Sequence, residues 1–244
     1  MQIITAAVIK GGTGKSSTIA ALAQAGAAAG KRILAVDLDP QANLSLFLAA
    51  DPSKLGSYEL LHGAPPAQVI QQSPQGIAAI TASPNLAAER TTPASAKRLQ
   101  EALEPIREDF DFIFIDTPPQ MGELTFNALQ ASTGLIIPLE TDNSSLQGLY
   151  QIADIAHQIQ HSNPDLLILG TILTRYDSRP KLNRYLKGVI TEQGQSNGAP
   201  FLMAIRPGIA IREAQAMQQS LFDYAPRSKP AQDYRKLFEL IQED

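Results

Sequence analysis

The chain has 244 residues, of which 44% are hydrophobic and 18% are charged, and its formal net charge is −4. These values exclude a disordered chain and fit a single domain over residues 1–244. The chain has no Cys, which excludes disulfide scaffolds, thiolate metal sites and a catalytic Cys. No apolar run reaches the ~18 residues of a membrane-spanning helix and no secretion signal is present, so we expect a cytoplasmic protein.

Short apolar runs alternate with longer helical patterns along the whole chain. The runs predicted as strands are residues 2–8, 32–37, 77–81, 112–116, 134–139, 166–173 and 200–205. The segments predicted as helices are residues 15–29, 94–106, 124–131, 146–160, 181–193 and 231–242. Most of the strands are continuously apolar, as strands covered on both faces are. The pattern predicts an α/β three-layer sandwich around a mostly parallel sheet, with residues 51–75 and 83–93 as irregular surface segments.

The first predicted strand runs directly into a glycine-rich loop that precedes a helix. The loop reads Lys10-Gly11-Gly12-Thr13-Gly14-Lys15-Ser16-Ser17. Glycines allow backbone N–H groups to turn toward phosphate oxygens, and the helix N-terminus adds positive potential. Lys15 would reach the β- and γ-phosphates, and the Ser16 hydroxyl would ligate Mg²⁺. The alternative, a glycine-rich turn without a ligand, does not explain why Gly-Lys-Ser follows.

This loop departs from the standard phosphate-binding pattern at two positions. The standard pattern has Gly where this chain has Ile9, and the next residue, Lys10, is an additional lysine. One cation per nucleotide is usual, so a second lysine beside the same phosphates suggests a further role for Lys10.

Two later strands end in acidic residues. The second strand leads into Asp37-Leu38-Asp39-Pro40-Gln41-Ala42-Asn43, and the strand over residues 112–116 ends in Asp116-Thr117-Pro118-Pro119. A carboxylate at a strand end near Ser16 can hold Mg²⁺, usually through a water molecule. A charged loop or a turn signal is the alternative in each case. The joint occurrence with the glycine-rich loop favours a metal role for Asp116 near Ser16. Asp37 and Asp39, two residues apart beside the same loop, could hold metal or water, or support the loop.

Together these motifs resemble the ParA/MinD superfamily of deviant Walker A P-loop ATPases, and most closely the small Soj-like ParA partition ATPases. The resemblance implies a P-loop NTPase fold, the cofactors ATP and Mg²⁺, and a homodimer that sandwiches ATP at its interface. It implies that Lys15 acts on the ATP of its own subunit and Lys10 on that of the partner. It also implies that Asp39 positions the attacking water, with Asn43 as an accessory, and that residues 116–119 form a nucleotide switch.

The resemblance extends downstream at scattered motifs. Ile137-Pro138-Leu139 and Leu146-Gln147-Gly148-Leu149 resemble the scaffold of the family. Thr174-Arg175-Tyr176-Asp177 and Arg206-Pro207-Gly208-Ile209 resemble segments beside the adenine base, so Arg175 and Pro207 become candidate nucleotide contacts. No extension precedes the first strand, which argues against the ParA subclass with a helix-turn-helix domain.

Basic residues are concentrated in one part of the chain. Residues 1–174 carry 9 Lys and Arg against 16 Asp and Glu, whereas residues 175–235 carry 10 against 5. The ParA resemblance implies sequence-independent DNA binding, with contacts to phosphates. The candidates are Lys181, Arg184, Lys187, Arg206, Arg212, Arg227 and Lys229. Arg184 and Lys187, three residues apart, should share a helix face; ordinary surface charge is the alternative for each of them.

The implied function is ATP-dependent partition of plasmids or chromosomes, or positioning of another cargo. An ATP-bound, nucleoid-associated dimer would be released by slow ATP hydrolysis that a ParB-like adaptor stimulates. The main alternative is a MinD-like membrane switch, but the acidic C-terminal residues 239–244 argue against stable membrane insertion. Metal-delivery relatives with this fold need Cys, and tyrosine-kinase relatives need a Tyr cluster, whereas Tyr224 and Tyr234 are isolated.

Overall fold

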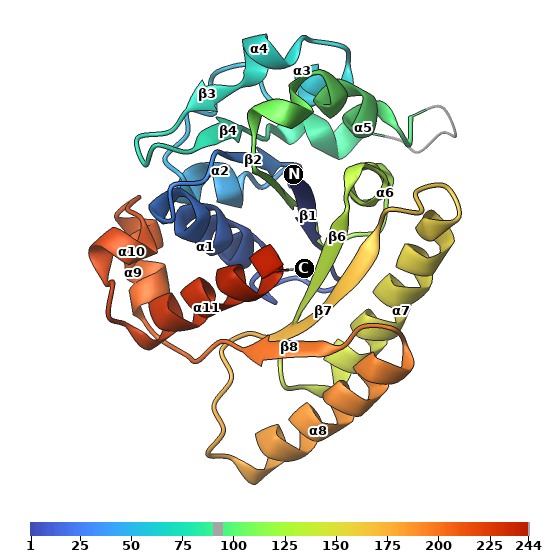
Figure 1. Cartoon of the computed structure of the whole chain (residues 1–244), viewed down its shortest axis with the longest axis vertical. Coiled ribbons are helices and arrows are strands. Elements are labelled where there is room, and N and C mark those ends of the chain that lie inside the picture. The colour runs from blue at the N-terminus through green and yellow to red at the C-terminus, as the bar shows by residue number, and fades with distance from the viewer. Residues whose placement is uncertain (90–94, 244) are drawn as a thin grey trace.

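Figure 1 shows a computed structural model of the chain, which describes residues 1–89 and 95–243. Within these residues eight strands form one sheet, in the order β3-β4-β2-β5-β1-β6-β7-β8. The strands are β1 (Gln2–Ala6), β2 (Ile33–Asp37), β3 (Gln71–Gln72), β4 (Ala78–Ile80), β5 (Phe112–Asp116), β6 (Gly134–Leu139), β7 (Leu167–Leu173) and β8 (Phe201–Ala204). Only the short edge pair β3–β4 is antiparallel. The prediction of a mostly parallel sheet is therefore confirmed.

Helices cover both faces of this sheet. They are α1 (Lys15–Ala28), α2 (Asn43–Phe47), α3 (Ser57–Leu61), α4 (Pro66–Val69), α5 (Arg98–Leu103), α6 (Glu123–Ala131), α7 (Asn143–Gln160), α8 (Lys181–Ser196), α9 (Ala210–Ala216), α10 (Leu221–Tyr224) and α11 (Lys229–Glu243), with the 3₁₀ helices η1 (Pro84–Ala88) and η2 (Glu104–Asp109). Successive side chains of β5 point to opposite faces of the sheet and enter two different cores. Phe112 and Phe114 lie in one core, and Ile113 and Ile115 lie in the other. The fold is the predicted three-layer α/β sandwich.

The first and last helices pack together on one face of the sheet (Figure 1). The apolar stripe of α11, formed by Tyr234, Leu237, Phe238 and Ile241, is buried as its helical spacing predicts. The Phe238 ring centroid lies 5.2 Å from that of Phe112. A glycine in α1 permits this approach, because a Cβ at Gly26 would lie 3.0 Å from Phe238 Cε2 of α11. The C-terminal helix is thus part of the core.

The structure differs from the sequence prediction in the less regular segments. The helix predicted over residues 94–106 begins outside the described residues and ends early, because α5 stops at Leu103 and η2 follows. Pro105 explains the change, since it has no N–H to donate to the carbonyl of Glu101. Residues 51–75, predicted as irregular, contain α3, α4 and β3. The described part of residues 83–93 contains η1. The short helices α2, α9 and α10 lie elsewhere in the chain and were not predicted.

Candidate nucleotide site

The predicted motifs meet at one edge of the sheet. Strands β1, β2 and β5 are neighbours, with Ala6 opposite Asp116 and Asp37 opposite Asp116. Because parallel strands end at the same edge, the loops that follow them converge there. These loops line a cavity of about 340 Å³, whose lining residues are Gly11, Gly12, Gly14, Lys15, Ser16, Ser17, Asp39, Gln41, Asn43, Phe47, Pro119 and Arg175.

The glycine-rich loop depends on backbone conformations that favour glycine. Gly12 and Gly14 have φ angles of +78° and +87°, in the left-handed region. Gly14 precedes the first residue of α1, and its carbonyl accepts the first hydrogen bond of the helix, from Thr18 N at 2.8 Å. The Thr174 hydroxyl donates to the Thr13 carbonyl at 2.8 Å and ties the loop to the end of β7. The N-terminus of α1 therefore opens onto the cavity, as an anion site requires.

Lys15 lies within this loop. Its side chain is buried, and Nζ donates to the Lys10 carbonyl at 3.1 Å. Burial lowers the pKa of Lys15, while the negative charges of Asp116 and Asp39 oppose the shift. A buried ammonium group with one backbone acceptor in the loop keeps donors available for phosphate oxygens.

Asp37 and Asp39 hold the loop after β2. Asp37 Oδ2 accepts hydrogen bonds from Ser45 N at 2.8 Å and Ser45 Oγ at 2.7 Å, and Oδ1 accepts from Asp39 N at 3.0 Å. Asp39 Oδ1 accepts from Gln41 N at 3.0 Å. Burial raises the pKa of Asp37 to about 6, against the lowering effect of its hydrogen bonds. Asp37 is thus a structural support for the loop, and Asp39 is the acid that lines the cavity.

Asp116 at the end of β5 fits a magnesium site. It is fully buried, and neither carboxylate oxygen makes a hydrogen bond of normal geometry among the described residues, although the nearby Ser16 hydroxyl acts to lower its pKa. Burial, and then the negative charge of Asp37, raises its pKa well above the usual value. Carboxylate and hydroxyl oxygens are ligands that suit Mg²⁺, so the residue types of Asp116, Asp39 and Ser16 fit this ion. In the described residues no cluster of three or more His, Cys, Asp or Glu could hold a metal ion.

The Lys10 side chain points away from the phosphate-binding loop, although the Lys10 backbone is the first residue of that loop. Its ammonium group forms an ion pair with Asp142, the N-cap of α7, and lies 4.0 Å from Glu140 Oε2. Burial acts to raise the pKa of Asp142, but hydrogen bonds from Lys10, Ser144 and Ser145 outweigh it and hold the pKa at about 2. The sequence prediction missed this acidic partner, although Asp142 followed by Asn-Ser-Ser is a recognisable helix N-cap.

Arg175 connects the phosphate loop to the same acidic segment. Its guanidinium donates to the Gly12 carbonyl and forms an ion pair with Glu140. Its φ angle is +52°, which is uncommon for a residue other than glycine. Arg175 lines both the phosphate cavity and a second cavity of about 540 Å³ beside it.

The second cavity has the size and composition of a base-binding site. Its lining is largely apolar, and it includes Pro207 together with Ile209, Gln215 and Tyr234. Gln215 Nε2 donates to Ser17 Oγ at 2.9 Å and thereby links the cavity to the loop. The structure thus brings the predicted residues Arg175 and Pro207 to one cavity. Arg212, predicted as a DNA contact, lines the same cavity.

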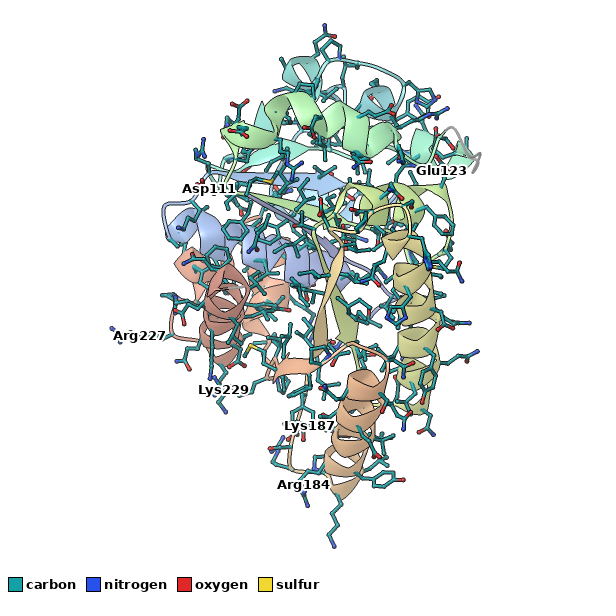
Figure 2. The ribbon with its side chains drawn as sticks, turned by 45° about the vertical axis from the view of Figure 1, so that its right-hand side comes forward. Asp111, Glu123, Arg184, Lys187, Arg227 and Lys229 are labelled. Atoms are coloured by element: carbon teal, nitrogen blue, oxygen red, sulfur yellow. The ribbon has the colours of Figure 1, made fainter. Side chains whose placement is uncertain are left out.

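The predicted DNA contacts differ in how freely their charges are exposed. Arg206 is ion-paired with the buried Asp233 at 2.7 Å, and the Lys187 ammonium lies 4.7 Å from the Phe201 ring centroid. Arg184 donates to the carbonyls of Ser178 and Arg179. Lys181, Arg212, Arg227 and Lys229 are exposed. Figure 2 shows Arg184 and Lys187 on α8 and Arg227 and Lys229 on another side of the molecule.

The expectation that Arg184 and Lys187 present one common charged face is therefore only partly correct. The Lys187 side chain is half-buried against the aromatic rings of Tyr176 and Phe201. Aromatic faces attract ammonium groups, and this attraction turns Lys187 toward the protein.

In the part of the chain that the structure describes, no helix has the length and apolar character needed to cross a membrane. The fold and the phosphate loop define the chain as a P-loop nucleotide-binding protein. A family model described as an AAA domain matches residues 1–168.

Comparison with known proteins identifies the family more narrowly. The chain is 32% identical to the chromosome-partitioning ATPase Soj of Thermus thermophilus over 234 residues, which cover 95% of this chain and 92% of that protein. It is 31% identical to the sporulation initiation inhibitor protein Soj of Bacillus subtilis over 245 residues, with 97% and 96% covered. The chain belongs to the ParA/Soj family of partitioning ATPases.

A solved structure of similar fold contains a nucleotide and magnesium. Cobyrinic acid a,c-diamide synthase from Mycobacterium smegmatis, with bound ADP and magnesium, matches with a TM-score of 0.82 and 29% identity. The match covers 99% of this chain and 94% of that one. A protein of this fold and similar length therefore holds a nucleotide with Mg²⁺.

Proposed function

We propose that this chain is a Mg²⁺-dependent ATPase that forms a homodimer around ATP, binds DNA without sequence preference as that dimer, and is released by slow hydrolysis. The observation that carries the proposal is the different placement of the two lysines. Lys15 lies buried within its own loop, whereas Lys10 is turned out of that loop toward Asp142. A lysine that does not serve its own phosphate site is available to a second subunit.

The residues of this chain would divide the work of hydrolysis between them. Lys15 and the backbone N–H groups at the start of α1 would hold the β- and γ-phosphates, and Arg175 and Pro207 would flank the base. Asp39 would orient the attacking water, since its carboxylate lines the phosphate cavity. Mg²⁺, held by Ser16 with Asp39 and Asp116 through water, would neutralise charge on the phosphates. Lys10 from the partner would add a further positive charge.

We infer that DNA binding depends on exposed cations that contact phosphates. Lys181, Arg227 and Lys229 are exposed and are the strongest candidates. Dimer formation would double the number of such contacts, so ATP would favour DNA binding through its higher affinity for the dimer. A ParB-like adaptor would act by stimulating hydrolysis, which returns the protein to monomers that bind DNA weakly.

The direct test is DNA binding with ATP or ADP at two salt concentrations, using duplexes of unrelated sequence. We expect the protein to bind DNA with ATP but not with ADP, and with the same affinity for every duplex. This affinity should fall as the salt concentration rises, and each phosphate contacted should contribute about −0.9 to the slope of log K against log salt. Binding that is indifferent to the nucleotide would contradict the proposal. ATP-dependent flotation with anionic liposomes, without DNA binding, would favour the MinD-like alternative.

A further inference from the structure

One side chain outside the two nucleotide cavities holds the ends of two helices that line them. Gln75 lies in the turn between β3 and β4, where Gly76 N donates to the Ser73 carbonyl at 2.9 Å. Its Nε2 donates to the Phe47 carbonyl at 2.8 Å and to the Gln218 carbonyl at 3.1 Å. Phe47 is the last residue of α2, and Gln218 follows the C-terminal cap of α9. A single amide thus binds a carbonyl at the end of each helix.

Neighbouring groups fix the orientation of the Gln75 amide. The Leu221 N–H can only donate, and it donates to Gln24 Oε1 at 3.1 Å. The Gln24 amide nitrogen therefore faces the other way, and it donates to Gln75 Oε1 at 2.8 Å. This leaves the Gln75 amide nitrogen toward the two helix-end carbonyls, which can only accept. Because Gln24 is buried on α1, the network is attached to the helix that begins at the phosphate loop.

The two helices that Gln75 joins line different cavities. Asn43 and Phe47 of α2 line the phosphate cavity. Arg212 and Gln215 of α9 line the cavity of about 540 Å³ that is the candidate base site. Helix α2 also packs on α1 and against α9. Gln75 is therefore a hydrogen-bonded connection between the wall of one cavity and the wall of the other.

Both helices depend on such contacts for their position. Helix α2 has five residues and α9 has seven, and helices this short are not stable without tertiary contacts. Each is followed by a residue other than glycine in the left-handed region, Ala49 with φ +55° and Gln218 with φ +53°. This conformation is uncommon for such residues, so contacts must hold each helix end in place. The hydrogen bonds from Gln75 lie at these two ends.

We propose that Gln75 is a positioning residue that couples the two cavities, so that a base held against α9 also stabilises the α2 wall of the phosphate cavity. The base would order α9, and Gln75 would extend that order to Phe47 and α2. Phosphates that order α2 would favour base binding to the same extent, because coupling between two sites is reciprocal. A phosphate chain without a base would gain nothing from this connection. The inference rests on the proposed binding of one nucleotide across both cavities.

The test compares ADP with inorganic pyrophosphate, which has the phosphate chain without ribose or base. Calorimetric titration with Mg²⁺ measures both dissociation constants for the wild type and for Gln75→Met, in which a side chain of similar length makes none of the hydrogen bonds. We expect ADP binding to weaken about fivefold, the loss expected for one hydrogen bond. Pyrophosphate binding should stay within about twofold, because the Lys15 side chain and the N–H groups at the start of α1 hold it without Gln75. Unchanged ADP affinity, or equal weakening for both ligands, would overturn the proposal.

Two further variants separate the coupling from a structural role. Gln75→Glu keeps the acceptor for Gln24 and removes both donors, so it should lose at least as much ADP affinity as Gln75→Met; wild-type affinity here would also overturn the proposal. Gln72→Met, at an exposed position of β3, is the matched control and should bind both ligands as the wild type does. Gln75 is half-buried in a surface turn, so its variants should fold.

Thermal unfolding supplies the readout that a purely structural residue would move. Such a residue would lower the unfolding temperature of Gln75→Met and leave the ratio of the two dissociation constants unchanged in the folded protein, which would reject the coupling. A wild-type protein that fails to bind ADP would instead contradict the proposed function. The two failures are therefore distinguishable.

Discussion

The three acids at the strand ends have different roles, and their contacts show why. Both oxygens of Asp37 hold backbone and hydroxyl groups of the following loop, whereas neither oxygen of Asp116 makes a hydrogen bond of normal geometry within the described residues, and the Ser16 hydroxyl lies near it. Asp39 lies on the cavity itself. Sequence spacing predicted that these acids meet, and the family resemblance implied that Asp39 positions the water and Asp37 does not; the contacts show what Asp37 holds instead. That distinction depends on where each carboxylate oxygen points.

Replacement of the water-positioning acid should abolish turnover but not nucleotide binding. We expect Asp39→Ala to lower the rate of ATP hydrolysis at least ~100-fold, the usual loss when a positioned carboxylate is removed. ATP affinity should change little, because Lys15 and the loop N–H groups remain. Phosphate release and fluorescent-nucleotide binding measure the two quantities. Asp154→Ala, at an exposed position of α7, is the control; hydrolysis near the wild-type rate in Asp39→Ala would exclude the assigned role.

The buried acids should make the nucleotide-free protein more stable at mildly acidic pH. Burial raises the pKa of Asp37 to about 6 and that of Asp116 well above its usual value. A carboxyl group whose pKa is higher in the folded state is penalised when ionised, so the penalty is full at pH 7 and disappears as pH falls through 6 toward 4. For Asp37 the shift corresponds to at most about 3 kcal/mol.

Urea unfolding at pH 7 and pH 5, without nucleotide or metal, measures this effect. Asp111 and Asp177, with pKa values held at about 2 by Arg32 and Arg179, lose their contribution only below pH 4, so they do not mask it. We expect a larger free energy of unfolding at pH 5. A decrease between pH 7 and pH 5 would show that these carboxylates are not penalised in the folded protein.

Helix α8 shows why charge alone does not identify a nucleic-acid contact. Lys181 and Lys187 lie on the same helix, yet Lys181 is exposed and Lys187 covers the rings of Tyr176 and Phe201. Lys181 occupies the first position of α8, where a cation opposes the helix dipole. It therefore contributes no stability and is free to contact phosphate.

The two lysines should respond oppositely to truncation. Lys187→Ala should lower the free energy of unfolding by about 1 kcal/mol through loss of the ring contacts, with a small effect on the salt dependence of DNA binding. Lys181→Ala should leave stability within about 0.5 kcal/mol and reduce the salt slope by ~0.9. Thermal unfolding and DNA titration over a salt series distinguish the two variants. A reversed pattern would exclude Lys181 as a phosphate contact.

At the level of elements, the sequence predicted the strongly patterned part of the fold. All seven predicted strands and the long helices α1, α7, α8 and α11 appear close to their predicted bounds, because continuous apolar runs and helical spacing are determined locally. The four-residue helices α4 and α10 were missed, since one turn of helix has little periodicity to detect. The early end of α5 was predictable from Pro105 in principle.

The site was predictable in its residue types but not in its partners. The phosphate loop, Asp39 and Asp116 could be named as candidates because their motifs are contiguous in sequence, and the fold brings them to one edge of the sheet. Glu140 and Asp142 lie more than 120 residues from Lys10, and only the fold brings them together. The same holds for Gln215 beside Ser17.

For the whole molecule, the account connects ATP to the association of two subunits. Lys10 is held by Asp142 of its own chain in the isolated subunit, so in the dimer proposed above it would exchange this partner for the phosphates of a second subunit. The ion pair therefore opposes dimerisation by an amount typical of a partly exposed pair.

Weakening this ion pair should favour the dimer. Asp142→Asn keeps the acceptor that caps α7 through Ser145 N but removes the charge. We expect the ATP concentration at half-maximal dimerisation to fall about two- to fivefold, as measured by light scattering. Asp154→Asn, also on α7 and exposed, should leave it unchanged. An unchanged or higher ATP requirement in Asp142→Asn would show that the pair does not restrain Lys10.

The most direct test of the central claim is sedimentation of Lys10→Ala in saturating ATP and Mg²⁺, made in an Asp39→Ala background that slows hydrolysis. The account predicts that the Asp39→Ala protein sediments as a dimer with ATP and as a monomer with ADP, and that adding Lys10→Ala leaves a monomer that still binds ATP. A Lys10→Ala protein that dimerises as readily as its parent would show that Lys10 does not reach across to the nucleotide of the second subunit.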